Sequence, residues 1–79
     1  MVTKIQSDLI RLLKACGLSQ EDTVAELTLL KTDENRQKMI DEIIAIYDRK
    51  GAVTEQEIQM IGLRLTGDLK PEYKDRISK

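Results

Sequence analysis

Residues 50–58, with the sequence KGAVTEQEI, contain the clearest local signals of the fold. Gly51 can adopt the left-handed conformation that commonly ends a helix. Thr54 and Glu57 have the spacing of a capping box, in which each side chain accepts a hydrogen bond from the other residue's backbone N–H. The valine and isoleucine that flank this box stand at the positions of a hydrophobic staple. The segment therefore predicts the end of one helix, a short turn and the start of another helix.

Similar start and stop signals recur along the chain. Ser19 and Thr32 are suited to be N-cap residues, and each is followed by two acidic residues that favour the positive end of a helix. Gly17 and Gly67 are further stop signals. Between these signals, apolar residues recur at helical spacing. We expect an all-α fold, a compact bundle of four helices at about residues 3–16, 20–30, 33–50 and 55–66.

The expected core consists of one apolar stripe from each helix. Residues 33–50 have the widest apolar face, so this helix is the expected centre of the core. The four stripes are Ile5, Leu9, Leu12, Leu13 and Cys16; Val24, Leu27 and Leu30; Met39, Ile40, Ile43, Ile44, Ile46 and Tyr47; and Ile58, Ile61 and Leu65.

Charge is unevenly distributed along the 79 residues, whose net charge is −1. Residues 70–79 hold four basic and two acidic residues, which leaves nine basic and twelve acidic residues in 1–69. We expect a helical domain over 1–69 and a short basic tail over 70–79, in which Pro71 can open a helical turn. The net charge of −1 argues against a strongly cationic nucleic-acid binder, because such a protein would carry an excess of Lys and Arg on one face.

The composition excludes most catalytic and metal-binding sites. The chain has no histidine and one cysteine, so common zinc sites and an intramolecular disulfide cannot form. Cys16 lies on an apolar stripe, where a thiol behaves as a small hydrophobic group. No motif places a lysine or carboxylate as a general base. We expect neither an enzyme nor a cofactor or metal, and in the absence of a signal sequence or spanning segment we expect a cytoplasmic protein with no membrane partner.

The stretch from Ile46 to Glu57 slightly resembles an EF-hand loop, with Gly51 at the turn position. Ile46 and Lys50 stand where that loop needs oxygen ligands. We therefore expect no calcium site, and the capping box accounts for Glu57.

Residues 17–27, GLSQEDTVAEL, resemble the start of the second helix in repressor-type helix-turn-helix domains. The chain departs from that family at Thr23, Val24 and Thr28, where an aliphatic residue, a small residue and a glycine are usual. The resemblance implies a DNA-binding regulator in which the helices expected at 20–30 and 33–50 meet DNA and the basic tail adds phosphate contacts. The basic residues that would make the helix contacts are Lys31, Arg36 and Lys38.

The helix expected at 33–50 has more apolar residues than one packing stripe usually accommodates. Either this helix is fully enclosed, or part of its apolar surface forms an interface with another chain. A small core without a disulfide or metal also favours self-association, most simply as a C2 homodimer. The residues expected at this protein interface are Met39, Ile43, Ile46 and Tyr47, together with Leu29 and Leu63 from neighbouring helices.

Residues 31–39, KTDENRQKM, and 54–58, TEQEI, loosely resemble helix starts in small all-helical proteins of Gram-positive bacteria and their phages. The resemblance implies a regulatory or inhibitory role on a mobile element, through binding of a host or phage macromolecule. We expect a non-enzymatic protein-interaction or regulatory module that acts through apolar helix surfaces. The alternative is a divergent helix-turn-helix DNA-binding regulator.

Overall fold

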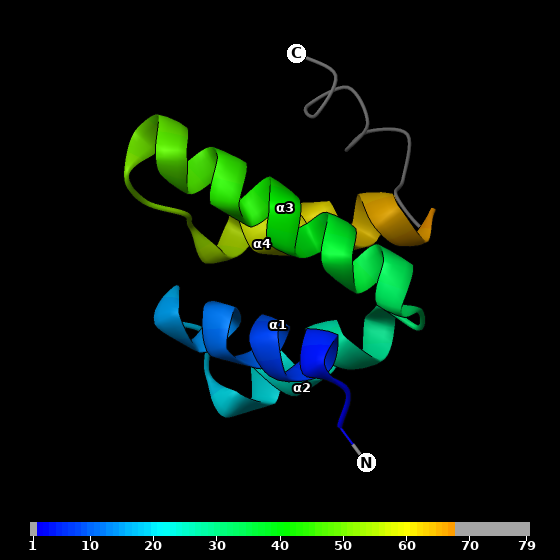
Figure 1. The fold of residues 1–79 in the computed structure, drawn as a ribbon. Helices are drawn as coiled ribbons and strands as arrows, with labels where there is room; N and C mark the ends of the chain where they lie inside the picture. The colour runs from blue at the N-terminus through cyan, green and yellow to red at the C-terminus, as the bar shows by residue number, and fades with distance from the viewer. Residues whose placement is uncertain (1, 68–79) are drawn as a thin grey trace.

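The computed structural model describes residues 2–67, which form an all-α bundle of four helices (Figure 1). Each observed helix boundary lies within one residue of the boundary predicted from the sequence. The tail predicted at 70–79 and the end of the predicted domain lie outside the described residues. The helices are α1 (Lys4–Ala15), α2 (Gln20–Leu29), α3 (Asp33–Lys50) and α4 (Glu55–Thr66).

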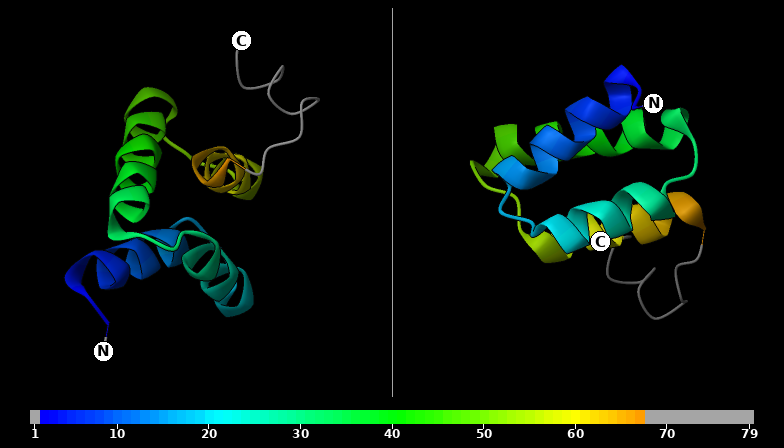
Figure 2. Two further views of the ribbon diagram at one scale, coloured as in Figure 1. Left: turned by 90° about the vertical axis from the view of Figure 1, so that its right-hand side faces the viewer. Right: turned by 90° about the horizontal axis from the view of Figure 1, so that it is seen from below.

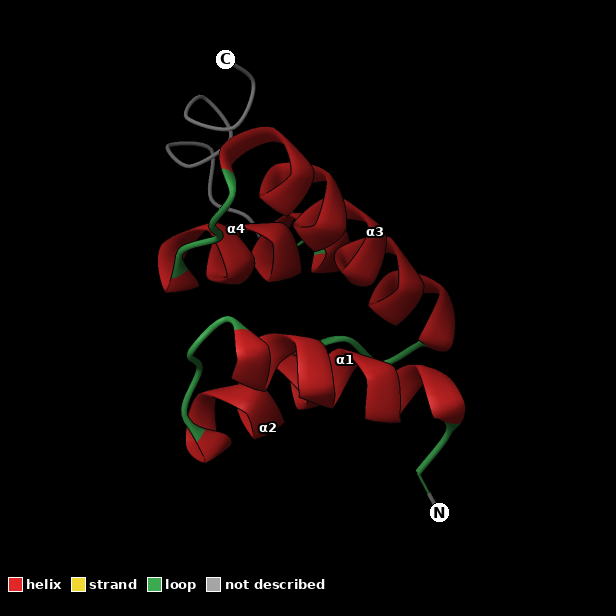
Figure 3. Cartoon of the chain, turned by 60° about the vertical axis from the view of Figure 1, so that its left-hand side comes forward, coloured by secondary structure: helices red, strands yellow, loops and turns green. Residues whose placement is uncertain are grey.

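The helices form two pairs that pack as two layers. α1 packs against α2, and α3 packs against α4 (Figure 3). Across the layers, α1 contacts α3 and α2 contacts α4 (Figure 2). α2 and α3, which are consecutive in the sequence, therefore lie on a diagonal of the bundle. The contacts α1–α3 and α2–α4 are the two seams that join the layers.

The predicted capping box at the start of α4 is confirmed. The Glu57 N–H donates to Thr54 Oγ1 over 3.1 Å, and the Thr54 N–H donates to Glu57 Oε1 over 3.1 Å. A second capping box, which the sequence reasoning missed, joins Thr3 and Gln6 at the start of α1. Gly51 ends α3 at φ +79°, as its stop signal predicted.

The core lies between the two layers and consists of hydrophobic residues from α1, α3 and α4 and from the segments that connect the helices. Most of the predicted stripes contribute to it, and α3 supplies three buried residues from its middle. The buried hydrophobic residues are Leu9, Leu13, Leu18, Leu30, Met39, Ile40, Ile43, Val53, Ile58 and Ile61.

The predicted stripe of α2 is wrong at Val24, which is 48% exposed. The buried α2 positions are Thr23 and Glu26 instead. The Thr23 hydroxyl donates to the Ser19 carbonyl over 2.8 Å, so its burial leaves no polar group unpaired. The buried face of α2 is therefore rotated relative to the predicted stripe. The apolar spacing of the sequence could not reveal this, because the inward positions are occupied by two polar side chains.

No helix among residues 2–67 combines the length and the apolar character needed to cross a bilayer.

Candidate protein-interaction groove

A groove of about 430 Å³ runs between the C-terminal halves of α1 and α3. We call it the α1–α3 groove. None of its lining residues is charged, which distinguishes it from the rest of a chain that is 34% charged. The lining residues are Leu12, Ala15, Cys16, Ile43, Ile44, Tyr47, Gly51, Ala52 and Val53.

The helical period of α3 separates the floor of this groove from its outer wall. Ile43 belongs to the buried stripe and has no exposed surface. Ile44 is the next residue, about 100° around the helix, and Tyr47 lies three residues further along on the same side. Ile44 is 46% exposed and Tyr47 is 58% exposed. Two large apolar side chains therefore stand beside a hollow of the same character.

The other walls come from the ends of two helices. Cys16 is the C-cap of α1, and its N–H donates to the Leu12 carbonyl over 3.0 Å. After Gly51, the chain turns back so that Val53 is buried against the core. Partial burial raises the pKa of the Cys16 thiol, so this side chain is neutral near pH 7. The groove thus has no ionised group to keep it hydrated.

A second groove, of about 540 Å³, lies on the other side of α3 against α4. We call it the α3–α4 groove. Unlike the α1–α3 groove, it is lined by charged side chains of both signs as well as by apolar ones. Its lining residues are Glu42, Ala45, Ile46, Arg49, Thr54, Gln56, Glu57, Met60, Ile61 and Arg64.

Ion pairs between α3 and α4 engage three of the four charged residues that line the α3–α4 groove. Arg64 of α4 donates to Glu42 of α3. Lys50 Nζ lies 2.7 Å from Glu57 Oε2. The Lys50 hydrogen bond, together with the Thr54 N–H, holds the pKa of the Glu57 carboxyl below its ordinary value. These carboxylates therefore act as partners of nearby cations and are poorly suited to act as general bases.

The predicted interface residues fall into different environments. Met39 and Ile43 have no exposed surface, so they are core residues, and Ile43 also forms the floor of the α1–α3 groove. Ile46 is half-buried and lines the α3–α4 groove. Tyr47 is exposed on the α1–α3 groove. The remaining two, Leu29 and Leu63, are half-buried on α2 and α4.

Sequence reasoning placed Ile44 in the core stripe and missed it as a surface residue. The available signal was the width of the apolar face of α3, since residues 39, 40 and 43 already complete one buried stripe. The contributions of Cys16 and Ala52 were not predictable in this way. They depend on how the end of α1 meets the loop after α3.

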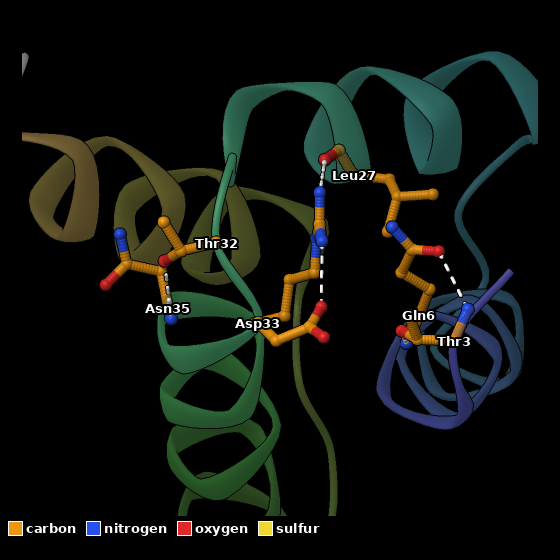
Figure 4. A network of polar contacts seen from close by, with 7 residues as sticks. Thr3, Gln6, Leu27, Thr32, Asp33 and Asn35 are labelled. Atoms are coloured by element: carbon orange, nitrogen blue, oxygen red, sulfur yellow. Dashed lines mark hydrogen bonds and ion pairs between the residues drawn. The ribbon is translucent and has the colours of Figure 1, made fainter.

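The residues predicted for nucleic-acid contact also differ in availability. Arg36 is mostly buried: its guanidinium donates to Asp33 Oδ1 over 2.9 Å and to the Leu27 carbonyl over 3.4 Å (Figure 4). Lys38 Nζ lies 3.4 Å from Glu34 Oε1, and Lys31 is exposed. Arg36 thus ties α3 to the end of α2. The helix-turn-helix alternative stays a prediction.

Within residues 2–67, no three Cys, Asp or Glu side chains are arranged to hold a metal ion. No family model, no curated protein and no solved structure matches this chain.

Proposed function

We propose that this chain is a non-enzymatic protein-interaction module, and that it binds its partner through the α1–α3 groove. The observation that carries the proposal is the coincidence of an uncharged hollow with two exposed apolar side chains, Ile44 and Tyr47. Covering such a surface removes apolar area from water, at about 25 cal/mol per Å². No salt bridge in the groove has to be broken for a partner to bind.

Tyr47 is the expected anchor of the interface. Tyrosine is enriched at interaction hot spots because it combines a large apolar surface with few rotatable bonds. Its hydroxyl can remain at the wet rim while the ring is covered. Ile44, one turn earlier, would add an aliphatic contact beside it.

The proposed partner is a second copy of the chain, in a C2 dimer. A two-fold interface requires one patch that is complementary to itself. The α1–α3 groove meets this requirement, because the protruding Ile44 and Tyr47 and the hollow beside them belong to one patch. The dimer in turn would serve a regulatory or inhibitory role on a mobile element, as the resemblance to small helical proteins of Gram-positive bacteria and phages implies.

Sedimentation equilibrium in the micromolar range tests this proposal. We expect the wild type to be a dimer and Ile44→Glu to be a monomer, since the glutamate would place a charge in the contact. Val24→Glu is the matched control: Val24 is exposed to a similar degree but lies on α2, away from the groove. A monomeric wild type would contradict the second copy as partner.

The single cysteine offers a second readout of the same groove. Cys16 lines the groove and is the only thiol in the chain. We expect maleimide to label Cys16 more slowly in the wild-type dimer than in Ile44→Glu, because the partner would cover it. Equal rates in a proven dimer would show that the interface lies elsewhere.

A further inference from the structure

Glu26 is a buried carboxyl at the α2–α4 seam, on the opposite side of the bundle from the α1–α3 groove. It is 7% exposed, and its Oε2 accepts no hydrogen bond. A carboxylate buried without a partner is strongly disfavoured, whereas the protonated acid carries no net charge. The folded arrangement therefore favours the protonated form.

Gly62 of α4 makes room for this carboxyl. A Cβ at that position would overlap Glu26 Oε2 and would lie 3.3 Å from both Leu29 Cδ2 and Met39 Cε. The carboxyl thus fills a space between α2 and α4 that no other residue type at position 62 would leave. Leu29 and Met39 also border this space, so the surroundings of the carboxyl are partly apolar.

The charged groups that face this part of the seam are acidic. Asp22 lies one turn before Glu26 on α2, and its charge disfavours ionisation of Glu26. Glu55, at the start of α4, faces Asp22, and their interaction raises the pKa of Glu55. Three carboxyl groups from two helices therefore gather where α2 meets α4.

Most of the cations among residues 2–67 are paired with other acids. Arg36 of α3 donates to Asp33 and to the Leu27 carbonyl. On the other elements of the described chain, the paired cations contact other acids: Arg64 contacts Glu42, Lys50 contacts Glu57, and Lys4 and Arg11 of α1 contact Asp8. Among residues 2–67, no ion pair compensates the charge of an ionised Glu26.

We propose that the α2–α4 seam is a proton-dependent latch in which Glu26 is the titrating group. When the carboxyl holds a proton from solvent, α2 packs against α4 around Gly62. When the proton is lost, α2 separates from α4 while the aliphatic α1–α3 seam holds the layers together. The latch does not depend on the proposed function of the groove.

Burial, with a smaller contribution from Asp22, raises the pKa of Glu26 to about 7. Since the folded-state pKa is above the ordinary value, the stabilising effect of protonation is complete below about pH 4.5 and is lost as the pH rises through about 7. The latch therefore responds near neutral pH.

Hydrogen exchange of the full chain tests the latch. Between about pH 5.5 and about pH 8.5, we expect the protection factors of α2 amides to fall roughly 30-fold, while those in the middle of α3 change little. In Glu26→Gln, which cannot titrate, this fall should disappear. Glu21→Gln, at an exposed site on α2, should retain it. An unchanged fall in Glu26→Gln, or an equal loss of protection in all four helices, would overturn the proposal.

A carbon NMR titration of the wild type remains informative if Glu26→Gln does not fold. We expect the Glu26 carboxyl to titrate near pH 7. A midpoint at the ordinary value for glutamate would overturn the latch.

Discussion

The two grooves beside α3 differ in chemistry more than in size. The α3–α4 groove is the larger, at about 540 Å³ against about 430 Å³. Three of its four charged side chains are already in ion pairs, as Arg64 is with Glu42. The α1–α3 groove has no charged lining residue and exposes Ile44 and Tyr47.

This difference teaches that volume alone does not identify a binding surface. A partner in the α3–α4 groove would have to desolvate paired charges, and exposed ion pairs return little free energy. A partner in the α1–α3 groove would cover apolar groups at little electrostatic cost.

The largest expected effect is at the floor of the α1–α3 groove. Ile43→Ala should lower the free energy of unfolding by about 2–5 kcal/mol, because it opens a cavity in a fully buried part of the core. Urea denaturation measures this. Ile44→Ala, on the exposed wall, is the control and should cost less than about 1 kcal/mol. Equal losses would mean that wall and floor belong to the same buried core.

The next largest change in stability is expected at the start of α4, where Thr54 borders the α3–α4 groove. Thr54→Ala should lower the free energy of unfolding by about 1 kcal/mol, since the Glu57 N–H would lose its acceptor. Thermal unfolding followed by circular dichroism checks this change. Thr54→Ser keeps the hydroxyl and should retain most of the stability. A neutral alanine variant would show that the capping box contributes nothing measurable here.

A smaller effect is expected for the ion pair across the α3–α4 groove. A double-mutant cycle of Glu42→Ala and Arg64→Ala should give a coupling of about 0.2–1 kcal/mol, because both side chains are more than one-third exposed. Denaturation of the four proteins supplies the cycle. A coupling well above this range would mean that the groove is a desolvated polar network, and the contrast with the α1–α3 groove would have to be redrawn.

The smallest effect is a pH dependence at Glu57. Lys50 lowers the pKa of this carboxyl, so its contribution to stability is present above the ordinary glutamate pKa and is lost as the pH falls through the lowered value. In Lys50→Met, an NMR titration should find the Glu57 midpoint at higher pH than in the wild type. An unchanged midpoint would contradict this role of Lys50. The dependence has the opposite sign to that expected for Glu26.

Much of the local structure was predictable because its causes are local. Thr54 and Glu57 are three residues apart, and Gly51 needs only its own backbone freedom to end α3. Tyr47 was expected both in the core stripe and at an interface, and it is exposed, so the core assignment is wrong and the interface stays a prediction. Met39 was expected at an interface and is buried instead. The contacts of α3 with α1 and α4 enclose it, and the apolar spacing within α3 does not reveal those contacts.

The sequence by itself determined the helices of this protein, since caps, stops and apolar spacing act within a few residues of each other. Only the tertiary structure decided which apolar residues remain exposed. Ile44 is exposed because α1 meets α3 along the stripe of Ile43, and Glu26 is buried because Gly62 allows α2 to approach α4. Both outcomes depend on contacts between residues distant in the chain, and such contacts follow from the packing of whole helices.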